Sequence, residues 1–372
     1  MPVDQRSSNP LAFVTQPTRR TLRVYALLAL GFITLLVLSN SSSLSESALD
    51  YSQTIRALSS FDGSQSSVAK FRQRFPSLRN VDQRGVPDES DHLLKREDNL
   101  WSGSGVFDWP RTTKMFVFGD SYSTIDSDYR KNGVDGGHHE RFHHKATDMK
   151  WSDYLYAVFH DFHVLQYYNF ARPGATVAQD IIPPGLEKYG TYTTQLQEFE
   201  DLFTPLPGPP RVNWHDNDTL FVVFFGINDM GRMNREDIGR MDIPETSTRL
   251  ARSVVEQTKR LYTLGARSFL FLNLPPLDRS PKYNLPSEVG IRSHDLIKQS
   301  TDVFNEQLET AVDEWKLELS AKDDSSEIMF FDLHSFYSTV LEYPELFGMT
   351  DCGRYQMTVD GKRPNLGRMG YW

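Results

Sequence analysis

Five short runs of apolar residues constrain the fold of this chain more than any other feature of its sequence. They occupy residues 114–119, 164–171, 219–226, 266–274 and 327–332. Their lengths are typical of strands, and a continuous apolar run indicates a strand buried on both faces. The first run ends in Gly119, which adds to the signal of a buried strand.

Segments with helical spacing separate the runs. One helix is expected to begin near Pro244, because proline suits the first turn, and to stop at Gly265. A second is expected over 293–319, where apolar residues recur on one side. Strands that alternate with helices predict an α/β fold. We expect a three-layer α/β/α sandwich with a five-stranded parallel sheet.

The N-terminal part has the pattern of a membrane-targeting segment. Residues 24–38 are apolar and uncharged, arginines lie just before them, and no Lys or Arg follows until Arg56. This asymmetry predicts a cytosolic leader over 1–23 and places the rest of the chain across the membrane. The long leader favours a single-pass type II signal anchor in the secretory pathway. A cleaved signal peptide, with secretion, is the alternative.

Composition changes again between the apolar run and the first strand. Residues 39–113 are rich in serine and charge and poor in apolar side chains, so a disordered stalk is expected. Asn40 and Asn217 begin glycosylation sequons, which have meaning only in a glycoprotein of the secretory pathway.

Charge and cysteine content exclude several classes. A formal net charge of −9 argues against a nucleic-acid partner, and the single cysteine, Cys352, excludes a disulfide framework and a multi-cysteine zinc site.

A cluster of four histidines is a candidate metal site. It consists of His138, His139, His143 and His144, but the adjacent glycines and charges indicate a solvated loop. No metal or cofactor is therefore expected.

Three strand ends carry side chains suited to catalysis. Ser121 follows the first run, and a hydroxyl on a tight strand-to-helix turn is exposed for attack. Gly174 follows the second and can bring a backbone N–H close to a substrate, and Asn228 follows the third with a side-chain amide. Because the carboxyl ends of parallel strands share one edge, these groups are expected to form an oxyanion hole. Each also has a simpler interpretation, as a turn residue or a helix cap.

The blocks around these residues resemble those of the GDSL (SGNH) hydrolases, and more narrowly the fungal acetylesterases of carbohydrate esterase family 16. The matching segments are 116–123, 169–175 and 226–229, with accessory stretches at 151–155 and 272–281. The resemblance implies a hydrolase domain over 114–348 that cleaves acyl esters, with acetylated carbohydrate as substrate. A lipase acting on longer acyl chains is an alternative within the same class.

The same resemblance implies roles for individual residues. Ser121 would be the nucleophile, while Gly174 and Asn228, with the Ser121 amide, would stabilise the tetrahedral intermediate. Asp120 is expected to hold the turn and is not carried over as the acid of the triad. Trp151, Trp214 and Trp315 are expected to serve in packing.

One departure from the family pattern concerns the general base. The family ends with an Asp-x-x-His block, whereas residues 349–372 contain no histidine and the last one is His334, with different spacing. Three interpretations follow. The tail is a truncated or altered ending, the protein is a catalytically silent relative that binds a glycan or another partner, or a second histidine replaces the base, His334 being nearest.

Overall fold

A single mixed sheet organises the computed structural model, which describes residues 101–102, 111–125, 127–134, 150–153, 156, 165–204, 214–233, 241–284 and 291–342. The sheet has six strands in the order β1-β6-β5-β4-β2-β3. Their bounds are β1 Trp101–Ser102, β2 Lys114–Gly119, β3 Gln166–Asn169, β4 Thr219–Phe224, β5 Ser268–Leu272 and β6 Glu327–Phe331. The strands β2 to β6 run parallel to one another, which confirms the predicted five-stranded parallel sheet.

The strand β1 was not predicted. It pairs antiparallel with β6, with Trp101 opposite Phe331, and it lies inside the range 39–113 that was expected to be a disordered stalk. The expectation was therefore wrong at residues 101–102. A two-residue edge strand has too short a pattern to stand out in a serine-rich and charged segment, because only its partner strand specifies it.

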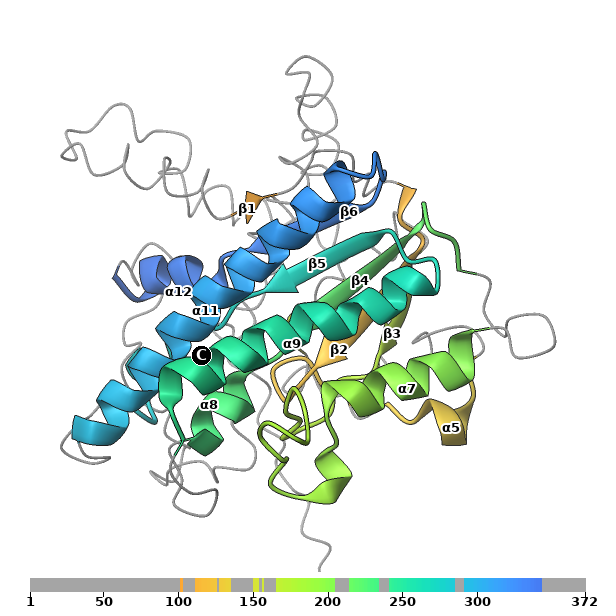
Figure 1. Cartoon of the computed structure of the whole chain (residues 1–372). Helices are drawn as coiled ribbons and strands as arrows, with labels where there is room; N and C mark the ends of the chain where they lie inside the picture. The colour runs from red at the N-terminus through yellow and green to blue at the C-terminus, as the bar shows by residue number, and fades with distance from the viewer. Residues whose placement is uncertain are drawn as a thin grey trace, which may run out of the picture.

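The helices occupy the connections between strands. They are α5 Tyr129–Asn132, α7 Tyr192–Phe203, α8 Ile227–Met233, α9 Ile243–Thr263, α11 Ile291–Ser320 and α12 Leu333–Glu342, with 3₁₀ turns η4 Glu187–Tyr189 and η6 Leu277–Arg279. Both helices predicted from spacing are confirmed. In α9, the Asp242 carboxylate accepts from Glu245 N at the start, and Gly265 follows the end with φ of +106°. The helices α7, α9 and α11 lie along one face of the sheet (Figure 1).

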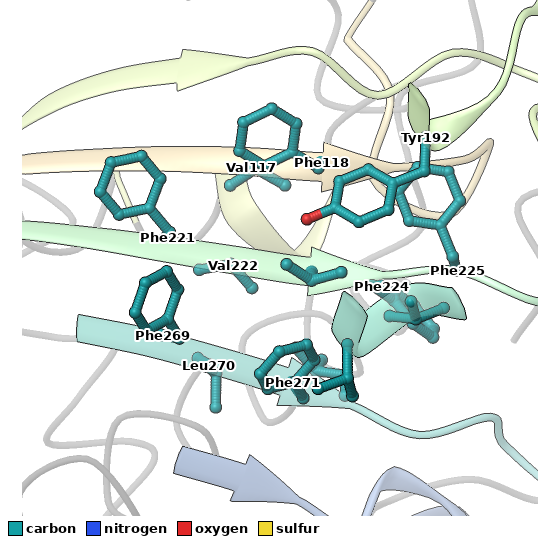
Figure 2. Close-up of a cluster of buried hydrophobic side chains, with 14 of the residues drawn as sticks. Val117, Phe118, Tyr192, Phe221, Val222, Phe224, Phe225, Phe269, Leu270 and Phe271 are labelled. Atoms are coloured by element: carbon teal, nitrogen blue, oxygen red, sulfur yellow. The ribbon is translucent and has the colours of Figure 1, made fainter. Parts of the chain in front are cut away.

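An aromatic core fills the space between that helical layer and the sheet. Phe116 of β2 stacks on Phe221 of β4 and meets Phe199 and Phe203 of α7 edge-on. Figure 2 shows side chains of β2, β4 and β5 in one buried cluster with Tyr192 of α7. Every residue of β2 and β4 is buried, which explains why these strands are apolar except at their first residues, Lys114 and Thr219.

The opposite face of the sheet is also covered. There Tyr156 packs on Tyr167 of β3, and Phe336 of α12 packs on Phe331 of β6. Helices on both faces make the fold the three-layer α/β/α sandwich that was predicted. Trp315 is buried against Phe269 as expected for a packing residue, and Trp151 and Trp214 are partly buried against the core.

Residues 24–38, predicted to be a membrane-targeting segment, and the tail at 349–372 lie outside the described residues, as does the first sequon. Within the described ranges, every helix is too short or too polar to serve as a membrane span. Asn217, which begins the second sequon, is exposed in the turn before β4.

Candidate active site

The turn after β2 presents Ser121. The carbonyl oxygen of Asp120 accepts from Ser123 N at 3.0 Å and Thr124 N at 2.9 Å, and its Oδ1 accepts from Tyr122 N at 3.0 Å. Asp120 is fully buried, whereas Ser121 is half-buried at the carboxyl edge of the sheet. Asp120 thus holds the turn, as predicted.

The loop after β3 is fastened to this turn. Arg172 N donates to the carbonyl oxygen of Gly119 at 3.1 Å, and Thr124 Oγ1 donates to the carbonyl oxygen of Ala171 at 2.8 Å. The two bonds join residues on either side of Ser121 to the segment that leads into Gly174. Gly174 itself has φ of +76°, a conformation that favours glycine.

The third strand end is fastened to the second. Asn228, in the first turn of α8, donates from Nδ2 to the carbonyl oxygen of Ala175 at 2.8 Å. Asp229 Oδ1 accepts from Val177 N at 3.1 Å. Asn228 therefore does more than begin a helix, because its amide is directed towards the Gly174 loop. That bond uses one of the two N–H groups of the amide.

Hydrogen bonds thus link the three segments that carry the site residues predicted from sequence. The loop of Gly174 contacts the turn of Ser121 on one side and Asn228 on the other. Serine hydroxyl, glycine N–H and asparagine amide at one sheet edge are the groups that acyl transfer requires for attack and for stabilising a developing oxyanion.

Two buried carboxyl groups, those of Asp120 and Asp229, lie next to Ser121 and Asn228 in the chain. Burial raises the pKa of Asp120 to about 7, and the bond from Tyr122 N and the charge of Lys150 oppose this rise. Burial likewise raises the pKa of Asp229 to about 7; the bond from Val177 N opposes the rise, and the charge of Asp120 adds to it. Since each pKa lies close to neutrality, these two groups carry less negative charge at neutral pH than two ordinary aspartates would.

Sequence reasoning missed two residues beside these groups. The ring of Tyr189 lies against Gly174, so that a Cβ added there would meet Tyr189 Cδ2 at 2.5 Å. Gln195 of α7 is buried and bonds the backbone of Gly119. The sequence did offer a signal for Gln195, because it is a polar residue on the apolar side of a helix. No local pattern identifies the partner of Tyr189.

The described histidines lie elsewhere. His334 donates its backbone N–H to Asn273 Oδ1 at 2.9 Å, and its Nε2 is 4.0 Å from Asp302 Oδ1. His294 pairs with the carbonyl oxygen of Tyr283. Among the described residues, no hydrogen bond joins a histidine to Ser121, and no group of His, Cys, Asp and Glu is arranged to hold a metal. The cluster from His138 to His144 lies outside these residues.

A parallel sheet between two helical layers, with serine, glycine and asparagine at successive strand ends, defines a protein of the SGNH class. The family model described as GDSL-like lipase/acylhydrolase matches residues 115–352. The chain belongs to this family.

Curated relatives agree with the assignment. The chain is 25% identical over 214 residues to an acetylesterase of Thermothelomyces thermophilus, an alignment that covers 58% of this chain and 66% of the relative. It is 21% identical over 264 residues to the thermolabile hemolysin of Vibrio parahaemolyticus, covering 70% and 55% respectively. A GDSL esterase/lipase of Arabidopsis thaliana is 24% identical over 159 residues, covering 41% and 42%. The chain thus spans less than two thirds of the length of these relatives.

Solved structures with a similar outline include an α/β hydrolase from the metagenome of Lake Arreo, Spain, with a TM-score of 0.39 and 16% identity over 69% of this chain and 89% of that one. A member of the lipolytic G-D-S-L family from Veillonella parvula has a TM-score of 0.32 and 14% identity over 68% and 91%.

Proposed function

We propose that this protein is an ester hydrolase that acts through an acyl-enzyme on Ser121. The proposal rests on the hydrogen bonds that join the Gly174 loop to the Ser121 turn on one side and to Asn228 on the other. They support a site in which one carbonyl oxygen can receive several donors at once. Preorganised donors of this kind are the largest single contribution to catalysis in many enzymes.

The proposed reaction has two stages. Ser121 Oγ attacks the ester carbonyl carbon and loses its proton to a general base, and the negative oxygen of the tetrahedral intermediate receives hydrogen bonds from Ser121 N–H, Gly174 N–H and Asn228 Nδ2. The alcohol leaves with a proton and the acyl group stays on Ser121. Water then attacks the acyl-enzyme, which releases the acid and restores the hydroxyl.

For the substrate we propose acetyl esters of carbohydrates. The acetylesterase relative supports the acetyl group, and the narrower resemblance of the motifs supports the carbohydrate. A lipase acting on long acyl chains is the alternative. Rates measured over a series of p-nitrophenyl esters of increasing chain length separate the two, because an acetylesterase loses activity as the chain grows.

The experiment for the proposal is hydrolysis of p-nitrophenyl acetate by the full chain. Wild type should exceed the background rate, and Ser121→Ala should lower kcat by roughly a million-fold, or to background, as loss of a serine nucleophile does elsewhere. Ser320→Ala, an exposed serine at the end of α11, is the control and should change nothing. Wild type and Ser121→Ala at the same rate would contradict the proposal.

A second candidate function is binding without turnover. Its specific support is that no described histidine is hydrogen-bonded to Ser121, while an unassisted serine hydroxyl is a poor nucleophile. A silent SGNH-fold protein would use the same edge of the sheet to hold a glycan or another partner. It should bind acetylated oligosaccharides in a glycan array without releasing acetate, and a blank array would count against it.

For localisation we propose the secretory pathway, with residues 24–38 as a single-pass type II anchor. The arginines before this run and the absence of Lys and Arg until Arg56 support that orientation. Carbonate extraction of membranes should leave an anchored protein in the pellet. Release into the supernatant would favour the cleaved signal peptide.

A further inference from the structure

The structure assigns a positioning role to Gln195, which we infer fixes the peptide from which the Ser121 turn departs. Gln195 Oε1 accepts from Gly119 N at 3.0 Å, and its Nε2 donates to the carbonyl oxygen of Gly119 at 2.7 Å. The side-chain amide satisfies both backbone groups of one residue, as a neighbouring strand would. The N–H and the carbonyl oxygen of Gly119 are both buried in these bonds, so water cannot replace Gln195 as their partner.

The two bonds from Gln195 matter for the proposed site because Gly119 lies next to the turn that carries Ser121. Gly119 is the last residue of β2, and a single residue, Asp120, separates it from Ser121. Its carbonyl oxygen also accepts from Arg172 N at 3.1 Å, so two different segments hold the same peptide plane. The plane cannot rotate without breaking both bonds. The direction in which the chain enters the turn, and with it the Ser121 N–H and hydroxyl, is therefore set here.

The helix that carries Gln195 is itself well anchored. Thr191 and Thr194 form a capping box at the start of α7, one turn before Gln195. Tyr192 OH is 2.8 Å from Thr258 Oγ1 of α9. Further along, Phe199 and Phe203 pack against Phe116 of β2. A side chain on such a helix holds its partner more precisely than one on a loop.

The catalytic consequence rests on the proposed function. If Ser121 is the nucleophile and its N–H an oxyanion donor, releasing Gly119 moves both relative to Gly174 and Asn228. A displacement of about 1 Å can cost on the order of a hundred-fold in rate. Gln195 has no contact with the substrate in this scheme, so its loss should lower kcat while KM changes little.

The test is Gln195→Glu, which keeps the shape of the side chain. A protonated carboxyl group can accept from Gly119 N and donate to the Gly119 carbonyl oxygen, whereas a carboxylate cannot donate. Hence the kcat of the variant relative to wild type, per folded molecule, should fall by about tenfold or more as pH rises and the new group ionises. The charged or titratable residues around this peptide include Asp120, Arg172 and Glu198 of α7, which pairs with Arg172 at 2.8 Å. All three are present in wild type, so the kcat ratio of variant to wild type cancels their own titration.

Gln197→Glu is the matched control. Gln197 lies on the exposed side of the same helix, and its ratio to wild type should stay flat with pH. Hydrogen exchange measured by mass spectrometry over residues 117–124 gives a readout that needs no turnover. In Gln195→Glu these amides should exchange faster than in wild type at high pH, and equally at low pH.

Each outcome of these measurements either supports or overturns the positioning role of Gln195. A falling kcat ratio with steady KM and faster exchange would support the positioning role. A flat ratio, or unchanged exchange around Gly119, would overturn it. If wild type hydrolyses no ester, the proposed function fails, but the exchange measurement still shows whether Gln195 holds the turn.

Discussion

Asn228 donates a hydrogen bond from its side-chain amide to the carbonyl oxygen of Ala175 at 2.8 Å. Ala175 directly follows Gly174, so this bond fixes the loop after β3 against the first turn of α8. Together with the bond from Arg172 N to Gly119, it turns three segments that are far apart in sequence into one site. The chemistry proposed for the protein depends on that arrangement.

Replacing Asn228 should therefore affect turnover more than substrate binding. We expect Asn228→Ala to lower kcat by about a hundred- to a thousand-fold, as the loss of one oxyanion donor does elsewhere. Asn228→Asp should lose more, because a carboxylate repels the developing charge and cannot donate to Ala175. Steady-state kinetics on p-nitrophenyl acetate provide the measurement. A rise in KM at constant kcat would mean that Asn228 binds the ground state only.

Gly174 should not tolerate a side chain, for two separable reasons. A residue with Cβ is strained at φ of +76°, and that Cβ would meet the ring of Tyr189 at 2.5 Å. Gly133 shares the first problem only, since its φ is +78° and nothing lies within 4 Å. We expect Gly133→Ala to cost about 1–3 kcal/mol of unfolding free energy, and Gly174→Ala to cost about 1–3 kcal/mol more than Gly133→Ala does.

Urea denaturation of the two glycine variants checks this difference. Because both share a positive φ, the excess cost in Gly174→Ala reports the contact with Tyr189. Equal losses in the two variants would show that the ring moves aside freely.

The buried carboxyl groups predict how stability depends on pH. Burial raises the pKa of Asp229 from its ordinary value of 3.8 to about 7 in the folded protein. Between these two values the unfolded chain has released the proton while the folded protein still holds it. The unfolding free energy should consequently fall as pH rises through this window and level off above about pH 7.

Asp229→Asn tests that contribution, because the amide oxygen can still accept from Val177 N. From about pH 5 to pH 7, the decline in unfolding free energy should be smaller in the variant by roughly 2 kcal/mol. Asp216→Asn removes an exposed carboxylate and should leave the decline unchanged. If the unfolding free energy from urea denaturation falls equally with pH in wild type and Asp229→Asn, the raised pKa of Asp229 does not contribute to stability as predicted.

Much of the fold could be predicted because its strands are buried on both faces. Lys114–Gly119 was predicted with its final bounds, and the other four parallel strands fell within the predicted runs. Apolar runs of this length carry the signal locally. The edge strand β1 could not be found in this way, since its two residues are specified only by pairing with β6.

The site was predicted in part for a similar reason. Ser121, Gly174 and Asn228 follow strands, and the topology of a parallel sheet brings strand ends to one edge. Gln195 and Tyr189 escaped notice because their partners, Gly119 and Gly174, lie 76 and 15 residues away and are chosen by packing. No periodicity or motif encodes such contacts.

The most direct test of the account is whether Ser121 becomes acylated. Full-length protein mixed with p-nitrophenyl acetate and quenched in acid should carry a single acetyl group, and peptide mapping by mass spectrometry should place it on Ser121. Ser121→Ala should carry none. Acetyl groups on other residues, or wild type that stays unmodified while it releases p-nitrophenol at the same rate as Ser121→Ala, would contradict the account.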